Sequence, residues 1–187
     1  MQVYNNTIHQ KMHEIADDLH ALYIRKNHDY GDSFSLSYKE YGLTMSFIRI
    51  EDKLRRLEKL SQADAQVKGE SIEDTLLDIA NYAIMTEMEL KIDQVGTYVP
   101  TKEDLHSKLL DEAIRTIIDP RESAQGFCQT GVLNFAITCI KLGLTKAKEA
   151  SDEREHAIPF AFIAAFAILG YLFLSAPTLL PSQEENQ

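Results

Sequence analysis

The sequence has little cysteine, and its first residues do not resemble a secretory signal. Its two cysteines, Cys128 and Cys139, lie in apolar surroundings without a cysteine-rich framework, so we expect reduced core thiols and no zinc site. Residues 1–6 have neither a basic region nor an apolar run, which predicts a cytoplasmic protein. No internal repeat and no low-complexity segment interrupts the chain.

Basic residues are outnumbered by acidic ones. The 187 residues include 19 lysines and arginines against 29 aspartates and glutamates, for a formal net charge of -10. A surface of that sign repels a phosphate backbone, so nucleic acid is disfavoured as a partner. A small nucleotide is not excluded, because carboxylates can hold a Mg²⁺ ion that bridges its phosphates.

Apolar residues recur at helical spacing along the chain, which predicts an all-α helical bundle, oligomeric and with an apolar C-terminal helix. We expect a nucleotide-handling region at residues 1–98, and C-terminal helices at residues 99–187 that pack on it or form an oligomer interface. The expected helices run from a cap at Thr7 to residues 26–27, from Thr44 or Ser46 to a polar linker at 61–70, and then over residues 71–91, 101–119, 123–150 and 157–180.

The helix over residues 71–91 carries the most informative polar pattern. Asp74, Asp78 and Asn81 share a narrow polar arc, with Tyr82 beside it, on a helix that is otherwise apolar nearly all round. Buried carboxylates need a partner, which can be a divalent cation or an ion pair. Asp74, three residues after Ser71, can also serve as a capping residue. Asp78 lies too far into the helix to cap it, which favours a functional role.

The preceding helix presents a basic stripe. Arg49, Lys53 and Arg56 follow one another at intervals of four and three residues and therefore share a face, with Asp52 at its edge. Such a stripe can clamp phosphate oxygens. The alternative is a solvated face with internal pairing between aspartate and arginine.

A polar loop is expected over residues 28–33. Tyr30 in this loop can stack on a base, and His28 can donate a proton. Asp29 adds a carboxylate, and Lys26 just before the loop can orient a phosphate tail. A segment of this composition is also compatible with a plain turn.

Three segments in this order, KNHDYGDSF, RIEDKLRRLEKL and ESIEDTLLDIANYAIM, resemble the phage-associated nucleotide modification associated domain 1 family. The resemblance covers roughly residues 7–89. Its layout is similar to that of the all-α nucleoside triphosphate pyrophosphohydrolases, MazG-like and dimeric dUTPase-like. It implies an oligomeric helical bundle that cleaves a nucleotide between its α and β phosphates. Leu54 and Thr75 stand where those enzymes have acids of their E-x-x-E and E-x-x-D motifs, so phosphate binding is better supported than hydrolysis.

The resemblance implies the following roles. Asp74 and Asp78, joined by Asp52 and Glu51, hold Mg²⁺, and Asp78, Asp74 and Lys53 are the catalytic residues. The nucleotide is bound by residues from all three segments: Lys26, His28, Asp29, Tyr30, Arg49, Arg56, Asn81 and Tyr82. The predicted function is a magnesium-dependent nucleotide-binding protein of the pyrophosphohydrolase kind. The alternatives are a non-catalytic nucleotide sensor or sequestering protein, and a membrane-anchored helical structural protein.

The C-terminal apolar segment, residues 157–180, contains no charged residue and is long enough to cross a membrane. Three interpretations are open: a membrane tail anchor, a helix buried in the bundle or at an oligomer interface, and an exposed binding patch. Alanines and Gly170 suit close helix packing, and we favour the buried helix.

Overall fold

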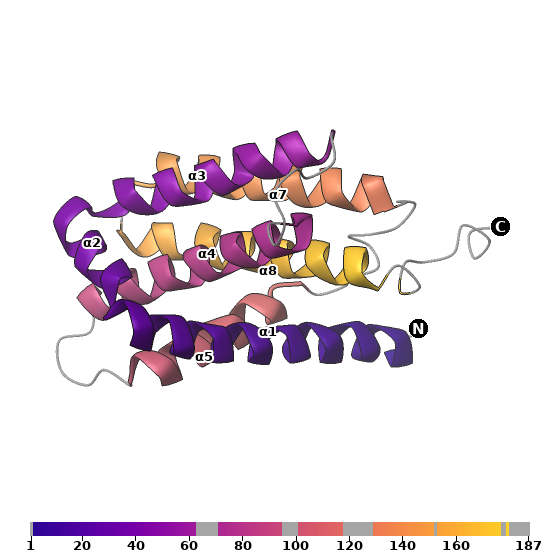
Figure 1. The fold of residues 1–187 in the computed structure, drawn as a ribbon, viewed down its shortest axis with the longest axis horizontal. Coiled ribbons are helices and arrows are strands. Elements are labelled where there is room, and N and C mark those ends of the chain that lie inside the picture. The colour runs from indigo at the N-terminus through magenta and orange to yellow at the C-terminus, as the bar shows by residue number, and fades with distance from the viewer. Residues whose placement is uncertain are drawn as a thin grey trace.

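The computed structural model describes residues 2–62, 71–94, 101–117, 129–151, 153–176 and 179 (Figure 1). Its elements over these ranges are α-helices with no strand, which confirms the all-α prediction. The helices are α1 (Gln2–Tyr30), α2 (Ser33–Tyr41), α3 (Leu43–Leu60), α4 (Ile72–Gln94), α5 (Lys102–Arg115), α7 (Gln129–Glu149) and α8 (Glu153–Ser175).

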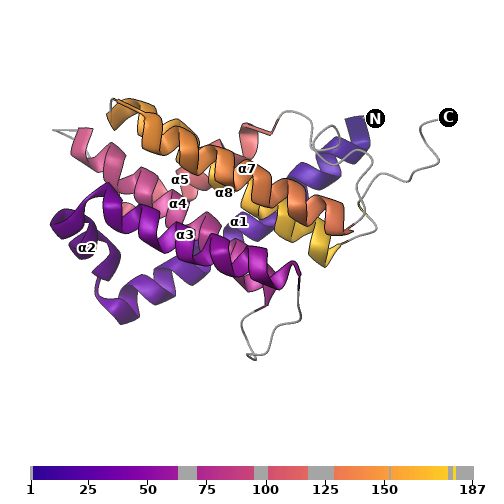
Figure 2. The same cartoon turned by 90° about the horizontal axis from the view of Figure 1, so that it is seen from above.

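The helices form three layers. In Figure 1, α4 and α8 lie in the middle, α3 and α7 lie above them, and α1 and α5 lie below. The view from above in Figure 2 agrees, because α3 and α7 lie in front of α4 and α8 there. The helices α4 and α8 pack extensively against each other, and α3 packs on α4 while α7 packs on α8. The core of the bundle therefore lies between α4 and α8.

Both central helices are apolar around most of their circumference, and both are buried. Leu76, Ile79 and Ala83 of α4 have no exposed surface, nor have Phe160 and Phe173 of α8. Small residues allow α7 and α8 to approach closely: a Cβ added at Gly170 of α8 would lie only 2.9 Å from Cβ of Ala136 of α7. The apolar C-terminal segment is therefore an interior helix of this bundle.

One described helix, over Glu155–Ser175, is long and apolar enough to cross a membrane. Of its most apolar stretch, 67% is buried inside the protein. An interior position accounts for an apolar circumference without any membrane. The membrane anchor and the oligomer interface stay predictions.

The N-terminal helices differ from their predicted boundaries. The helix α1 begins at Gln2, so Thr7 lies inside it and the predicted cap is wrong. It also continues to Tyr30, so the predicted loop shrinks to a turn at Gly31 and Asp32, whose φ angles are 60° and 57°. The helix α2 is absent from the prediction. Three of its residues are buried, too few in nine residues to show a helical period.

The later helices follow the prediction more closely. The capping box at the start of α4 is confirmed: Ser71 N–H donates to Asp74 Oδ2 at 3.1 Å, and Asp74 N–H donates to Ser71 Oγ at 3.0 Å. Thr101 caps α5 in the same way, accepting from Asp104 N–H at 3.1 Å. The helix α5 ends at Arg115 and α8 ends at Ser175, so the predicted ends at residues 119 and 180 are too late. The predicted helix start at residue 123 lies outside the described residues.

Candidate functional site

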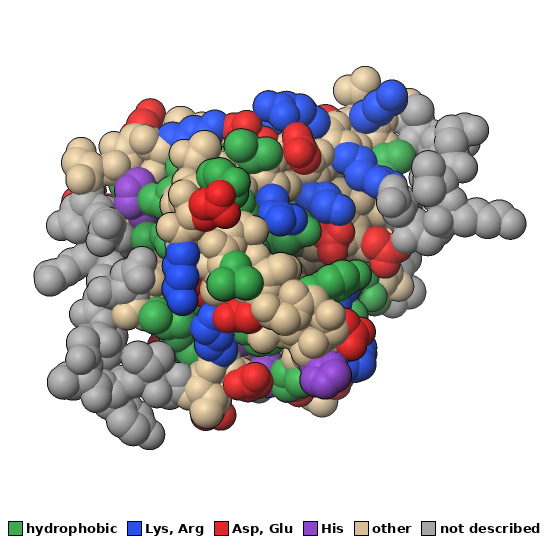
Figure 3. All heavy atoms as spheres, turned by 60° about the vertical axis from the view of Figure 1, so that its left-hand side comes forward, with side chains coloured by type: hydrophobic (Ala, Val, Ile, Leu, Met, Phe, Trp, Pro, Cys, Tyr) green, Lys and Arg blue, Asp and Glu red, His purple; other side chains and the backbone are tan. Residues whose placement is uncertain are grey.

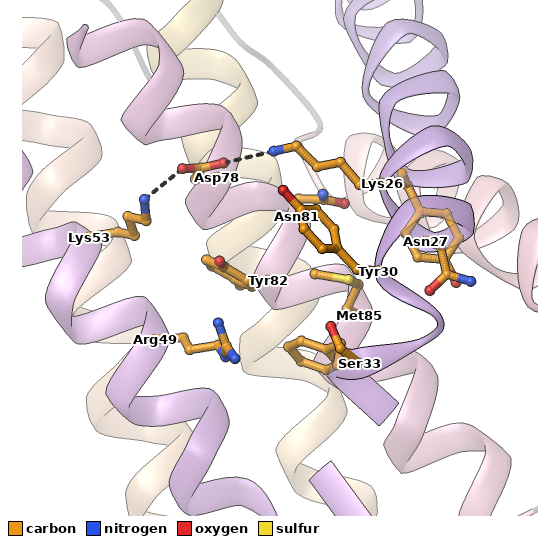
Figure 4. Close-up of a pocket in the computed structure, with 12 residues that line it drawn as sticks. Lys26, Asn27, Tyr30, Ser33, Arg49, Lys53, Asp78, Asn81, Tyr82 and Met85 are labelled. Atoms are coloured by element: carbon orange, nitrogen blue, oxygen red, sulfur yellow. Dashed lines mark ion pairs between the residues drawn. The ribbon is translucent and has the colours of Figure 1, made fainter. Parts of the chain in front are cut away.

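A cavity of about 390 Å³ opens between α1, α3, α4 and the start of α2 (Figure 4). Its size falls in the range of small-molecule sites, roughly 300–1,000 Å³. Its wall combines cationic, aromatic and amide side chains: Tyr23, Lys26, Asn27, Tyr30, Ser33, Phe34, Arg49, Lys53, Asp78, Asn81, Tyr82 and Met85.

One carboxylate in this cavity lies between two ammonium groups. Lys53 Nζ of α3 lies 2.7 Å from Asp78 Oδ2, and Lys26 Nζ of α1 lies 3.7 Å from Asp78 Oδ1 (Figure 4). The side chain of Asp78 is 30% exposed, so solvent reaches the group. With Arg49, the cavity holds three cationic side chains and one carboxylate. It therefore carries a local positive excess in a protein of formal net charge -10.

Arg49 is held at the wall of the cavity. Its Nε donates to Met45 Sδ at 3.1 Å, and its guanidinium lies 5.6 Å from the centroid of the Tyr82 ring. Tyr82 in turn stacks on Phe34, with centroids 6.2 Å apart. Weak thioether and cation–π contacts orient the guanidinium without neutralising it. Its charge is thus available to a ligand.

The remaining wall is aromatic. Tyr23 and Phe34 are buried, whereas Tyr30 is 69% exposed at the rim. Burial raises the pKa of Tyr23, with Asp32 and Glu103 adding to the rise, so its hydroxyl stays protonated. Flat rings around a cationic centre are suited to a ligand that has a planar part and an anionic part.

A second hollow, of about 290 Å³, adjoins the cavity. Lys26, Lys53 and Asp78 line both spaces. The full lining of the second hollow is Leu22, Lys26, Lys53, Arg56, Asp74, Thr75, Leu77 and Asp78. The ion pairs of Asp78 with Lys26 and Lys53 therefore lie between the two spaces. The predicted basic stripe is divided accordingly, since Arg49 lines the first space and Arg56 the second.

The four carboxylates predicted to hold Mg²⁺ do not form one group, although Asp74 and Asp78 line the same hollow. Asp74 is engaged in the helix cap. Asp52 pairs with Arg55 at 3.1 Å, and Glu51 pairs with Arg55 at 3.2 Å and with Lys148 of α7. Lys148 lowers the pKa of Glu51, which keeps that carboxylate ionised in its ion pair. Across the described parts of the chain, no three His, Cys, Asp or Glu side chains gather to hold a metal. This donor set does not fit a shared magnesium site.

Two predicted ligand residues lie off the cavity. His28 and Asp29 contact each other, at 3.2 Å from Nδ1 to Oδ1, and both are largely exposed. Because α1 continues through Tyr30, Tyr23, Asn27 and Tyr30 follow one another at intervals of four and three residues and share a face, which lines the cavity beside Lys26. Continuing the helix to Tyr30 and counting back from that residue by three and four would have identified Asn27 and Tyr23. Ser33 and Phe34 could not be found, since α2 was not predicted.

One face of the molecule shows how its surface charges are distributed. On the face drawn in Figure 3, lysine and arginine side chains alternate with aspartate and glutamate and with hydrophobic groups. Positive side chains there do not merge into one broad basic surface. The positive excess described above comes from the residues that line the cavity.

The segment that supplies most of the cavity matches a known family. Residues 26–90 match the family model "Nucleotide modification associated domain 1". This segment, about a third of the chain, contains every lining residue of the cavity except Tyr23. No curated protein and no solved structure matches the chain. The resemblance to this family is thereby supported over the matched residues, whereas the similarity to MazG-like pyrophosphohydrolases has no support from the comparisons.

Proposed function

We propose that the protein binds a nucleotide, or a closely related phosphorylated small molecule, in the cavity between α1, α3 and α4. The observation that carries the proposal is the convergence of Lys26, Arg49 and Lys53, from two different helices, on one space that also holds aromatic rings. Three cations around one carboxylate leave a charge that a phosphate group can balance. The match of residues 26–90 to a nucleotide modification associated domain is consistent with this ligand class.

The arrangement suggests how such a ligand lies. Lys26 and Lys53 bind phosphate oxygens at the boundary between the two spaces, and Arg49 adds a second contact from the same helix as Lys53. The base packs among Tyr30, Phe34 and Tyr82, because base–aromatic stacking contributes about 1–3 kcal/mol per base.

Asp78 occupies the position between the lysines that a phosphate would take. Its carboxylate and a ligand phosphate compete for the same ammonium groups. Neutralising Asp78 should therefore strengthen phosphate binding in the absence of metal. A carboxylate that binds Mg²⁺ predicts the opposite result, because its loss would abolish magnesium-dependent binding.

Hydrolysis and a magnesium requirement stay predictions. No three of the predicted metal ligands lie together, so the geometry favours binding over metal-assisted cleavage. An assay for released pyrophosphate with Mg²⁺ and each of the common nucleoside triphosphates tests hydrolysis directly.

The first experiment measures binding of nucleoside triphosphates and inorganic pyrophosphate by calorimetry, with Mg²⁺ and with EDTA. Lys53→Gln should weaken binding at least about tenfold, or about 1.4 kcal/mol. Lys59→Gln removes the same charge from an exposed position of the same helix and should leave affinity unchanged. Asp78→Asn should bind pyrophosphate in EDTA more tightly than the wild type.

Two results would count against this proposal. If neither pyrophosphate nor any nucleotide binds the wild-type protein, the cavity is not a phosphate site. If Lys59→Gln weakens binding as much as Lys53→Gln, the ligand responds to overall charge and not to the cavity. Loss of binding in Asp78→Asn only when Mg²⁺ is present would replace direct phosphate binding with a metal site.

A further inference from the structure

A hydrogen-bonded chain of side chains lies behind the cavity and joins three helices. Nδ1 of His20 (α1) lies 3.1 Å from Nδ1 of His106 (α5), and Nε2 of His106 lies 3.0 Å from Oδ1 of Asn81 (α4). His106 is fully buried, and its ring stacks on Tyr23 with centroids 4.0 Å apart and planes 4° from parallel. Asn81 lines the cavity, so this series of hydrogen bonds ends at the cavity wall, where Tyr23 also lies.

The protons along this chain follow from the chemistry of its atoms. Burial, with a smaller contribution from His20, lowers the pKa of His106 to about 3, so the imidazole is neutral and carries one N–H. The amide oxygen of Asn81 can only accept, so His106 donates from Nε2. Nδ1 of His106 then accepts from the N–H of His20 Nδ1. The side-chain oxygen of Asn81 thereby accepts a hydrogen bond from His106 within the protein.

The part of Asn81 left for a ligand is its amide nitrogen, which has two N–H donors and no acceptor. Rotating the amide would turn these donors toward the N–H of His106, and the buried polar groups would stay paired only if His106 and His20 changed tautomer together. Without that joint change the unpaired groups typically cost about 1–3 kcal/mol. In the tautomers described above, His106 thus holds Asn81 in the orientation that the structure shows.

Building on the proposed nucleotide function, we propose that Asn81 is a specificity-determining residue, oriented by His106, that donates to a carbonyl oxygen of the base. The site would therefore select a base with an oxo group over the matching base with an amino group. An amino group in that position would face the donors of Asn81 with donors of its own. One such mismatch typically changes affinity roughly ten- to hundredfold.

The test compares affinities within two matched pairs, UTP against CTP and ITP against ATP, by calorimetry. Each pair differs in an oxo or amino group, so the ratio within a pair cancels the contribution of the phosphates. The wild-type protein should prefer the oxo member of at least one pair at least tenfold. Asn81→Asp replaces the donors by acceptors and should bring that ratio to one or below.

A His106→Phe variant tests the orienting role. It removes the donor to Asn81 and keeps a ring to stack on Tyr23, so the ratio should fall several-fold while pyrophosphate affinity is retained. A purely structural His106 would lower the melting temperature and leave the ratio unchanged, which would overturn its assigned role. If His106→Phe does not fold, the affinity ratio of Asn81→Asp decides whether Asn81 determines the specificity.

The failures of the two proposals are distinguishable. Nucleotides that bind with equal affinity within both pairs would overturn the role of Asn81 and leave the nucleotide function standing. Absence of any nucleotide or pyrophosphate binding would instead remove the proposed function, and this inference with it.

Discussion

The two ends of α4 carry ionic clusters of opposite composition. Near its start, one carboxylate, Asp78, lies between the ammonium groups of Lys26 and Lys53. Toward its end, single lysines lie between pairs of carboxylates. Lys91 is 3.0 Å from both Glu87 and Glu112, and Lys102 is 2.5 Å from Asp32 and 3.5 Å from Glu89.

The difference in composition corresponds to a difference in burial. Side chains of Glu87 and Glu89 are 5% exposed, so their excess negative charge has to be compensated inside the protein. Ser35 donates a hydrogen bond to Glu89, and burial raises the pKa of Glu87 to about 7. Around Asp78 the excess is positive and reaches an open cavity. The buried clusters thus serve the fold, whereas the cavity cluster is free to balance an anion.

The largest expected effect comes from Lys102→Met. This change leaves Asp32 and the buried Glu89 without their cation, and we expect a loss of about 3 kcal/mol in the free energy of unfolding. Denaturant titration measures it. Lys108→Met, at an exposed ion pair of the same helix, should cost at most about 0.5 kcal/mol. Equal losses in both variants would mean that burial does not distinguish the two clusters.

A smaller effect is expected from Glu87→Gln, and it should depend on pH. The folded protein binds a proton at Glu87 up to about pH 7, whereas the unfolded chain releases it near pH 4.5. Stability from this group is therefore fully present below pH 4.5 and is lost as the pH rises through 7.

The Glu87→Gln variant should escape this loss, gaining about 2 kcal/mol relative to the wild type between those pH values. Unfolding titrations across this range measure the difference. Glu112→Gln, which removes the more exposed partner of Lys91, is the matched control and should retain the wild-type slope. Parallel slopes for the wild type and Glu87→Gln would show that Glu87 is ionised throughout.

The smallest effect concerns the turn between the cavity and the Lys102 cluster. Gly31 has a φ of +60° and no atom within 4 Å of an added Cβ, so Gly31→Ala meets conformational strain alone. We expect a loss of about 1 kcal/mol in stability and unchanged nucleotide affinity. Gly31→Asn should cost less, because asparagine tolerates this conformation. A large fall in affinity would show that the turn couples the two clusters.

Much of the candidate site could be read from helical spacing. Arg49 and Lys53 were predicted to share a face, as were Asp78 and Asn81, and all four line the cavity. Spacing within one helix determines the angle between side chains, so these groupings do not depend on the rest of the fold. The predicted metal site could not be derived in this way. It combined Glu51 and Asp52 of one helix with Asp74 and Asp78 of another, and spacing within one helix does not determine distances between helices.

Other parts of the site depended on contacts that no local pattern carries. The helix α2 has a short buried face, formed by Phe34, Ser35 and Tyr38, and only its first residue, Ser33, lay in the predicted loop. His106 gave no signal in the sequence, since its partners His20 and Asn81 are 86 and 25 residues away. Burial between helices, not a motif, makes this histidine part of the site.

The sequence by itself determined that the protein is helical, that α4 and α8 are apolar nearly all round, and that Asp78 and Asn81 point the same way. These properties follow from composition and from the 3.6-residue period of the helix. Only the tertiary structure decided which side chains Asp78 and Asn81 meet. The packing of α1, α3 and α5 around α4 buries apolar faces, and it thereby brings Lys26, Lys53 and His106 to their partners.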